Sequence, residues 1–230
     1  MVKTARRRPR AAAPPTRDRL LEAAREEFAA RGFDGAKVAR IVRRARVNKA
    51  MLYYHFPSKA ALYVAILGEQ FTAVADAVQS VRQSGAAPEA QLRQFIDRLA
   101  QEALVRPHFP PMWLREIADG GRHLDATVIG EIRRVVETLA AILAEGRASG
   151  VFRDAHPFVV QIGIVAPLMF FAATRPLRQR VGGLVPAHLV LPELDVVVRH
   201  LQSATLSVLL AGPVARPGTF AVTRTSVAST

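Results

Sequence analysis

Residues 38–59, VARIVRRARVNKAMLYYHFPSK, constrain the fold more than any other stretch of the chain. Apolar residues recur at helical spacing on both sides of a break at residues 45–47, and Pro57 must end the second stretch. The pattern predicts two short helices, from about Lys37 to Arg44 and from Asn48 to about Tyr54, joined by a tight turn. A helix pair of this form places its second helix in the major groove of DNA.

Positive charge is concentrated in the same part of the chain. Residues 1–60 hold 16 Lys and Arg against 5 Asp and Glu, whereas residues 61–230 hold 16 against 14. Most of the net charge of +13 therefore lies in the first quarter and indicates double-stranded DNA as a partner. The chain has no cysteine, which excludes disulfides, thiolate zinc sites and cysteine nucleophiles and fits a reducing, cytoplasmic location.

Helical spacing continues through the rest of the chain, punctuated by Gly and Pro. The first helix is expected to begin at Thr16 as N-cap and to end at Gly32, and Ser58 is expected to cap a long helix. We therefore expect an all-α protein with an N-terminal three-helix helix-turn-helix domain over 16–60 and a larger helical domain over 61–211. The later helices of this domain are expected at 88–105, around 112–117, and at 125–149, 157–173 and 192–211. A Pro-rich connection is expected at 107–111 and a loop at 178–191. We expect a disordered basic arm at 1–15 and a flexible tail at 212–230.

One segment is long and apolar enough to compare with a membrane span. Residues 155–174 contain no Asp, Glu, Lys or Arg. The segment also contains Pro157, Gln161 and Pro167, and ordinary polar sequence flanks it. We therefore favour a buried helix and expect no membrane partner, with the membrane-associated protein kept as the alternative.

Residues 16–66 resemble the DNA-binding domain of the TetR family of bacterial transcriptional regulators. The resemblance rests on TRDRLLEAAREEFAARGF, VARIV, ARVNKAMLYYHF and SKAALYVAIL, and its most specific part is Leu52–Phe56 followed by Ser58-Lys59. Residues 144–157, AEGRASGVFRDAHP, are also similar to a recurring segment of the family's ligand-binding domain. The resemblance implies a transcriptional repressor that binds a palindromic operator as a homodimer. A small-molecule inducer is expected to release it from the DNA.

Two positions depart from the family's pattern. A Thr pair usually opens the second helix, and here Ala36-Lys37 stands there; the turn is usually Ala-Gly-Val-Ser, and here it is Ala45-Arg46-Val47-Asn48. Because the glycine is absent, Arg46 is expected to adopt a left-handed backbone conformation, and its side chain makes that conformation about 1 kcal/mol less stable than it is for glycine. Loss of the Thr cap costs a similar ~1 kcal/mol, and both changes add positive charge near the DNA.

The second helix of the pair and its flanks supply the candidate DNA contacts. Lys suits guanine and Asn suits adenine, small apolar side chains suit a thymine methyl, and Tyr, His and further cations suit phosphates. By these rules the predicted contacts to base edges are Asn48, Lys49, Ala50 and Met51. The predicted contacts to phosphates, or sources of general attraction to DNA, are Lys37, Arg43, Arg46, Tyr53, Tyr54, His55 and Lys59. In the N-terminal arm, the candidates for the minor groove are Arg6, Arg7, Arg8 and Arg10.

Each assignment has a plainer alternative. Leu52 and Phe56 are expected in the core, and one of Tyr53 and Tyr54 is a candidate for half-burial there. The second-helix arginines are equally compatible with a solvated face, and the arm with a solubility tail.

The helical domain is expected to dimerise and to bind an effector. The apolar helices 157–173 and 192–211 are the dimer candidates, with a purely intramolecular core as the alternative. Met and aromatic side chains on the middle helices predict a pocket for flat or apolar ligands, with ordinary core as the alternative for each. The predicted pocket residues are Phe109, Met112, Trp113, Ile117, Val128, Ile132, Met169 and Phe170.

Other functional classes find little support in the sequence. His108, His123 and His156 lack metal-ligand spacing, so no metal or cofactor is expected. There is no nucleophile elbow, phosphate-binding glycine loop or metalloprotease His pair, so an enzyme is not expected. An architectural DNA binder remains the main rival to a regulator, and strong preference for a palindrome at moderate salt separates the two.

Overall fold

The computed structural model describes residues 15–184, 186 and 192–210, and all of the regular structure in these ranges is helical. An isolated antiparallel bridge joins Phe152 to Leu210. The all-α prediction is confirmed. The helices are α1 Thr16–Gly35, α2 Val38–Ala45, α3 Lys49–His55, α4 Lys59–Arg82, α5 Pro88–Val105, α6 Phe109–Ala118, α7 Ala126–Ala148, α8 Pro157–Ala173, α9 Arg175–Val181, the 3-10 turn η1 Gly182–Leu184 and α10 Leu194–Leu209.

Side-chain caps fix the starts of the helices around the DNA-binding motif. Asn48 accepts a hydrogen bond from the backbone N–H of Met51 at 2.8 Å, and Ser58 accepts one from Ala61 at 3.0 Å, as predicted. Thr16 is not an N-cap: Pro15 occupies that position, and the Thr16 hydroxyl instead accepts a hydrogen bond from Arg19 at 3.2 Å. The predicted cap is wrong because the helix starts one residue earlier than the Thr pattern suggests.

Positive φ angles mark the two bends of the three-helix unit. Arg46 has φ 54° and ψ 47°, so this arginine adopts the left-handed conformation for which glycine is usual. Gly32 has φ 67° as expected, but α1 continues past this kink for one more turn to Gly35. The turn between α2 and α3 therefore keeps its left-handed geometry despite the arginine side chain.

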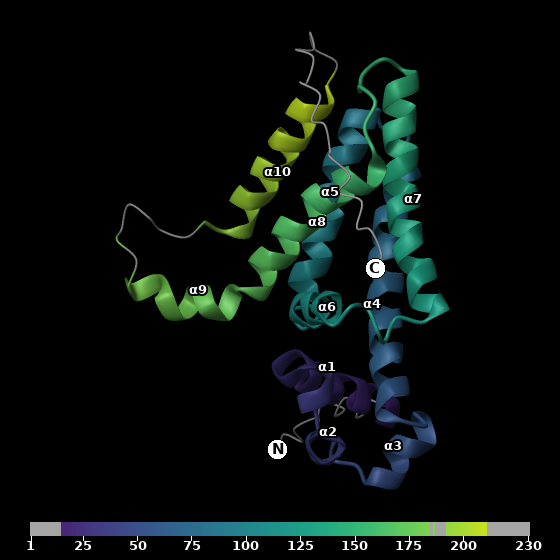
Figure 1. The fold of residues 1–230 in the computed structure, drawn as a ribbon, viewed down its shortest axis with the longest axis vertical. Helices are drawn as coiled ribbons and strands as arrows, with labels where there is room; N and C mark the ends of the chain where they lie inside the picture. Colours follow the sequence, from purple (N-terminus) through teal and green to yellow (C-terminus); the bar gives the residue numbers. More distant parts are fainter. Residues whose placement is uncertain (1–14, 185, 187–191, 211–230) are drawn as a thin grey trace, which may run out of the picture.

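Helices α1–α3 form one end of the molecule, and α4 runs from them into the body formed by α5–α8 and α10 (Figure 1). The apolar face of α4 packs on α5 and α7, while α6 packs between α1 and α8. Among the described helices α4 alone is long and apolar enough by itself to span a membrane, and half of its most apolar stretch is buried in the protein. Its apolar character is explained by these helix contacts.

The predicted loop at 178–191 is wrong at its start. Residues 175–181 form α9 and residues 182–184 form η1, which project away from the body beyond α8 (Figure 1). Arg, Leu and Gln are good helix formers and Pro176 lies in the first turn, so local propensity explains a helix with few tertiary neighbours. The predicted arm at 1–15, except Pro15, the end of the loop and the tail at 212–230 lie outside the described residues.

The end of α7 is closed by a tight contact between Gly146 and Phe152. The Gly146 carbonyl accepts hydrogen bonds from the backbone N–H groups of Val151 and Phe152, both at 2.9 Å. A Cβ on Gly146 would lie 2.0 Å from the Phe152 ring, so only glycine admits this packing. The backbone N–H of Arg153 then donates to the Leu209 carbonyl at 2.8 Å, which ties this turn to the end of α10.

Candidate DNA-binding surface and effector pocket

Helix α3 is oriented by two buried side chains. Leu52 is fully buried and Phe56 is 5% exposed, as predicted for core residues, so the opposite side of α3 faces outward. Tyr54 is 80% exposed and Tyr53 is 42% exposed, so Tyr53 is the more covered of the two and neither lies in the core. The predicted DNA contacts that lie exposed are Lys37, Arg43, Arg46, Asn48, Lys49, Ala50, Met51, Tyr53 and Tyr54.

Asn48 has a structural role beside its predicted DNA contact. Its Oδ1 already accepts the backbone N–H of Met51 and caps α3. A bidentate contact to adenine needs both the oxygen and the nitrogen of the carboxamide. Asn48 Oδ1 keeps a second lone pair, but the cap fixes the orientation of the carboxamide and so restricts how it can meet a base. The neighbouring Lys49 Nζ lies 5.7 Å from the centre of the Tyr53 ring.

Lys59 was predicted to contact phosphate, and the structure gives it another role. Its Nζ donates to the carbonyl oxygens of Phe33 at 2.8 Å and Ala36 at 3.3 Å, and lies 4.3 Å above the centre of the Phe33 ring. Two of its three N–H donors thus hold the end of α1 against α4. His55 is half-buried, and its ring packs 5.2 Å from that of Tyr54.

The three arginines of α2 and Arg46 at its C-cap divide into two pairs. Arg40 Nε donates to Glu27 Oε1 at 2.6 Å, and Arg44 forms an ion pair with Glu26, so these two hold α2 against α1. No ion pair of Arg43 or Arg46 is found in the described part of the chain, and both side chains are exposed. Of these four arginines, Arg43 and Arg46 therefore supply free positive charge to this surface.

Glu27 joins α1 to the start of α2. Its side chain is buried and also accepts the backbone N–H of Lys37 at 3.2 Å. Burial alone would raise the pKa of Glu27, but the hydrogen bonds from Arg40 and Lys37 outweigh it and hold the pKa below its usual value. The carboxylate is thus ionised when it orients the two helices.

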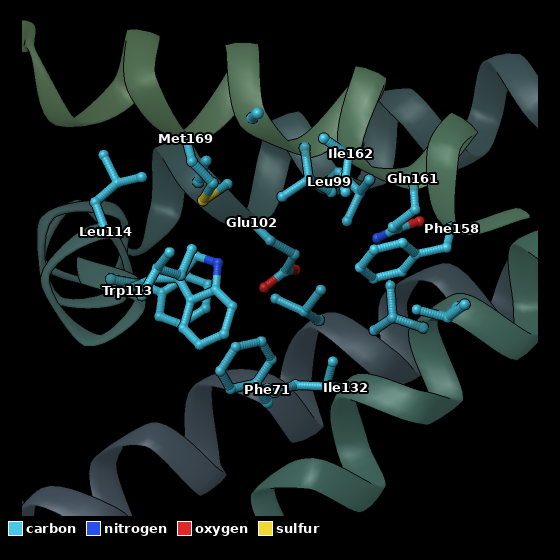
Figure 2. Close-up of a pocket in the computed structure, with 18 residues that line it drawn as sticks. Phe71, Leu99, Glu102, Trp113, Leu114, Ile132, Phe158, Gln161, Ile162 and Met169 are labelled. Carbon is cyan, nitrogen blue, oxygen red and sulfur yellow. The ribbon is translucent and has the colours of Figure 1, made fainter. Parts of the chain in front are cut away.

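A cavity of about 530 Å³ lies between α4, α5, α6, α7 and α8 (Figure 2). Aromatic rings build one wall: Phe71 lies edge-on to Phe109 at 5.0 Å and to Trp113 at 4.8 Å between ring centres. The volume falls within the range usual for small-molecule sites, and nearly all of the lining is apolar. Glu102 and Gln161 are the polar exceptions.

Five of the eight predicted pocket residues line this cavity: Phe109, Trp113, Ile117, Ile132 and Met169. The other three do not. Met112 and Val128 are each 1% exposed and are packed within the core, whereas Phe170 is 65% exposed on the outer side of α8. Sequence reasoning missed Phe71, Phe158, Glu102 and Gln161 as lining residues.

Helix α6 connects this cavity to the DNA-binding end. Trp113 and Leu114 line the cavity, while the neighbouring Arg115 donates to the carbonyls of Phe28 and Ala29 in α1. Arg122, just after α6, forms an ion pair with Asp34 at 2.5 Å. Both arginines bind the last turns of α1, so the same short helix is cavity wall and support for α1.

A buried polar cluster lies at the same junction. Glu116 is 1% exposed, and its carboxylate contacts both the backbone N–H and the ring of His123. The His123 ring packs against Phe33 at 4.1 Å and Tyr63 at 5.1 Å between centres. Burial and the nearby Glu116 carboxylate raise the pKa of Tyr63 far above its usual value, which keeps this hydroxyl protonated.

No group of three or more His, Cys, Asp or Glu side chains suited to a metal ion is found within 15–184, 186 and 192–210. His123 is occupied by Glu116, and His108 and His156 precede α6 and α8.

A helix-turn-helix unit joined by α4 and α6 to a helical body with an apolar cavity is typical of DNA-binding transcription regulators. The sequence model of bacterial regulatory proteins of the tetR family matches residues 20–66, and that of the tetracyclin repressor-like C-terminal domain matches residues 88–184. The chain belongs to the TetR family, and it is a DNA-binding transcription regulator.

Known relatives agree with this assignment. The transcriptional repressor NicS of Pseudomonas putida is 28% identical over 165 residues, which are 68% of this chain and 74% of NicS. The transcriptional regulator RutR of Escherichia coli is 27% identical over 182 residues, 79% of this chain and 85% of RutR. A solved tetR-family regulatory protein from Rhodococcus RHA1 superposes with a TM-score of 0.71 at 16% identity, covering 87% of this chain and all of that one, and so shares the fold.

Proposed function

We propose that the protein is a homodimeric repressor that binds a palindromic operator and is released when a small molecule fills the cavity between α4 and α8. The proposal assigns residues 16–60 to DNA binding and residues 61–211 to effector binding and dimerisation, in the bacterial cytoplasm where the operator is found. The relative NicS is itself named a repressor, which supports the sign of regulation.

One observation carries the coupling between effector and operator. Trp113 in α6 lines the cavity, and Arg115, two residues on, holds the carbonyls at the end of α1. An effector that displaces Trp113 must therefore move the support of the DNA-binding unit. The effector shifts the equilibrium only by its difference in affinity between the two arrangements, so that difference sets the size of the response.

Exposed apolar side chains on α8 and α10 support dimerisation. Val159 and Phe170 of α8 are 67% and 65% exposed, and Val208 of α10 is 64% exposed. Helices α8 and α10 pack on each other and on α5, so these side chains lie on faces that the described chain leaves uncovered. A second copy applied to the same faces would bury them in an isologous interface.

The first experiment is selection of bound sequences from a random DNA pool by the purified full-length protein at about 0.15 M salt, where non-specific phosphate binding is weakened. We expect an enriched inverted repeat whose half-sites are about one helical turn apart. Tight binding without any enriched sequence would instead favour an architectural DNA binder. A molecule that fills the cavity but leaves operator affinity unchanged would refute the coupling while leaving DNA recognition intact.

A further inference from the structure

The cavity contains one acidic side chain and no basic one. Of its 18 lining residues, Glu102 alone is charged and Gln161 alone is a neutral amide. Figure 2 shows the Glu102 carboxylate pointing into the space between Trp113 and Phe158. An incoming ligand therefore meets negative charge surrounded by hydrocarbon and aromatic faces.

Glu102 forms one ion pair within the described part of the protein. Its side chain is 17% exposed, and Arg106, one turn later in the chain, forms an ion pair with its Oε2. Arg106 itself does not line the cavity, so the carboxylate is the charge that a ligand contacts.

Gln161 supplies an independent sign of a missing partner. The residue is 9% exposed and lines the cavity, and its Oε1 is buried with no hydrogen-bond partner in the described part of the structure. A buried carbonyl oxygen without a donor costs free energy, and the cavity is the direction from which a donor can come. Because the two ends of a carboxamide exchange by rotation, Gln161 can offer an acceptor to this space.

We propose that the effector is a lipophilic aromatic cation that carries an N–H donor, such as a protonated arylalkyl amine. Its ammonium group would lie against Glu102, its rings against Phe71 and Trp113, and its N–H would reach Gln161. This inference rests on the proposed function and names the ligand class for that same cavity.

The same geometry argues against anionic effectors. A carboxylate placed in this cavity would lose its water, would find no basic lining residue and would approach Glu102. A cation gains both the Glu102 charge and the faces of Phe71 and Trp113, since aromatic faces attract cations. The discrimination between cation and anion is therefore the sharpest consequence of the proposal.

Three probes of one shape test it on the full-length protein without DNA. They are biphenyl-4-ylmethylamine, which is protonated at neutral pH, the neutral biphenyl-4-ylmethanol, and the anionic biphenyl-4-carboxylate. Trp113 is the single tryptophan of the chain and lies in the cavity, so quenching of its fluorescence reports binding at this site, and calorimetry gives the affinity. We expect the amine to bind at least about tenfold more tightly than the alcohol, and the carboxylate to bind weakest.

Three variants test whether Glu102 causes the preference for the amine over the alcohol. Glu102→Gln is expected to lower amine affinity at least about tenfold and to leave alcohol affinity nearly unchanged. Arg106→Gln is expected to raise amine affinity, because it removes the competing cation. Glu89→Gln, the same change in the first turn of α5, is the matched control and is expected to change neither amine affinity nor alcohol affinity. A folding defect alone would not lower the amine affinity of Glu102→Gln and raise that of Arg106→Gln.

Tighter binding of the carboxylate than of the amine, equal loss of amine and alcohol affinity in Glu102→Gln, or no binding of any probe would overturn the cationic class. A subsequent operator-release assay keeps the two proposals apart. If the carboxylate binds and releases the operator, the ligand class is wrong and the regulatory function stands. If the amine binds with the expected charge dependence but never affects operator binding, the proposed function fails instead.

Discussion

The carboxylate of Glu116 holds His123 at two points: Oε1 accepts the backbone N–H at 2.8 Å, and Oε2 lies 3.0 Å from Nδ1. Because Glu116 is in α6 and His123 packs on Phe33 of α1, this contact braces the junction between cavity and DNA-binding unit. We expect Glu116→Gln to lower the free energy of unfolding by about 1–3 kcal/mol, since it leaves buried polar groups poorly paired. Denaturant unfolding measures this, and Glu137→Gln, an exposed change on α7, is expected to stay within about 0.5 kcal/mol.

Arg46 combines a strained backbone with a useful charge. Arg46→Gly is expected to raise the free energy of unfolding by about 1 kcal/mol, because glycine adopts this left-handed conformation without strain. The same variant should bind DNA less tightly, since it removes a cation beside α3. Arg46→Ala loses the charge but keeps the strain, so it should match Arg46→Gly in DNA affinity and the parent in thermal stability. Equal stability of both variants would show that Arg46 is not strained.

Lys49 and Arg43 are expected to differ in what they contribute to DNA binding. Lys49→Ala should cost about 1–3 kcal/mol on the preferred operator and relax the choice of base at one position of each half-site. Arg43→Ala should weaken binding to all sequences alike and reduce the salt dependence of log K by about one unit per subunit. Titrations against operator and scrambled duplexes at several salt concentrations measure both. An identical loss on both duplexes for Lys49→Ala would remove its base-reading role.

The depressed pKa of Glu27 predicts a dependence of stability on pH. A group whose pKa is lower in the folded protein stabilises the fold above its unfolded value, near 4.5, and loses that contribution as pH falls through the folded value. We expect Glu27→Gln to be less stable than the parent by about 1–2 kcal/mol at neutral pH, with the difference shrinking below pH 4.5. Thermal unfolding of both proteins across this range measures the effect. A difference that grows on acidification would contradict the assigned sign.

The proposed dimer can be broken at a single apolar position. Val159→Asp on α8 is expected to give a monomer in sedimentation analysis, because a carboxylate would be buried in the interface without a partner. Ile129→Asp introduces the same charge at a comparably exposed position of α7, which does not pack on α10, and should remain dimeric. A dimeric Val159→Asp protein would place the interface elsewhere.

Local signals explain why the DNA-binding unit was predictable from sequence. Asn48, Ser58 and Pro57 act within three or four residues of themselves, so the positions of α3 and α4 follow from neighbours in the chain. The roles of side chains were harder to predict. Lys59 has the charge of a phosphate contact, but only the folded arrangement brings the Phe33 carbonyl within 2.8 Å of its Nζ.

The cavity was predictable in its apolar parts and not in its polar ones. Trp113 and Met169 follow from apolar helical faces, whereas a Glu and a Gln are ordinarily assigned to solvent. A signal was present: Glu102 lies three residues after the inward-facing Leu99, and Gln161 lies three residues after Phe158, so both fall on apolar stripes. Helix α9 was missed for the opposite reason, since it has no buried residue and hence no apolar stripe.

The 24 residues of α4 make a rigid rod about 36 Å long. One end is fastened at Arg82, whose guanidinium donates to Gln91 at 2.8 Å and pairs with Glu145, and the other end carries Lys59 and the three-helix unit. A rotation of about 5° around the fastened end moves the other end by about 3 Å. That distance is close to the rise of one base pair, about 3.4 Å, so a tilt of a few degrees is enough to put a recognition helix out of step with its DNA by one base.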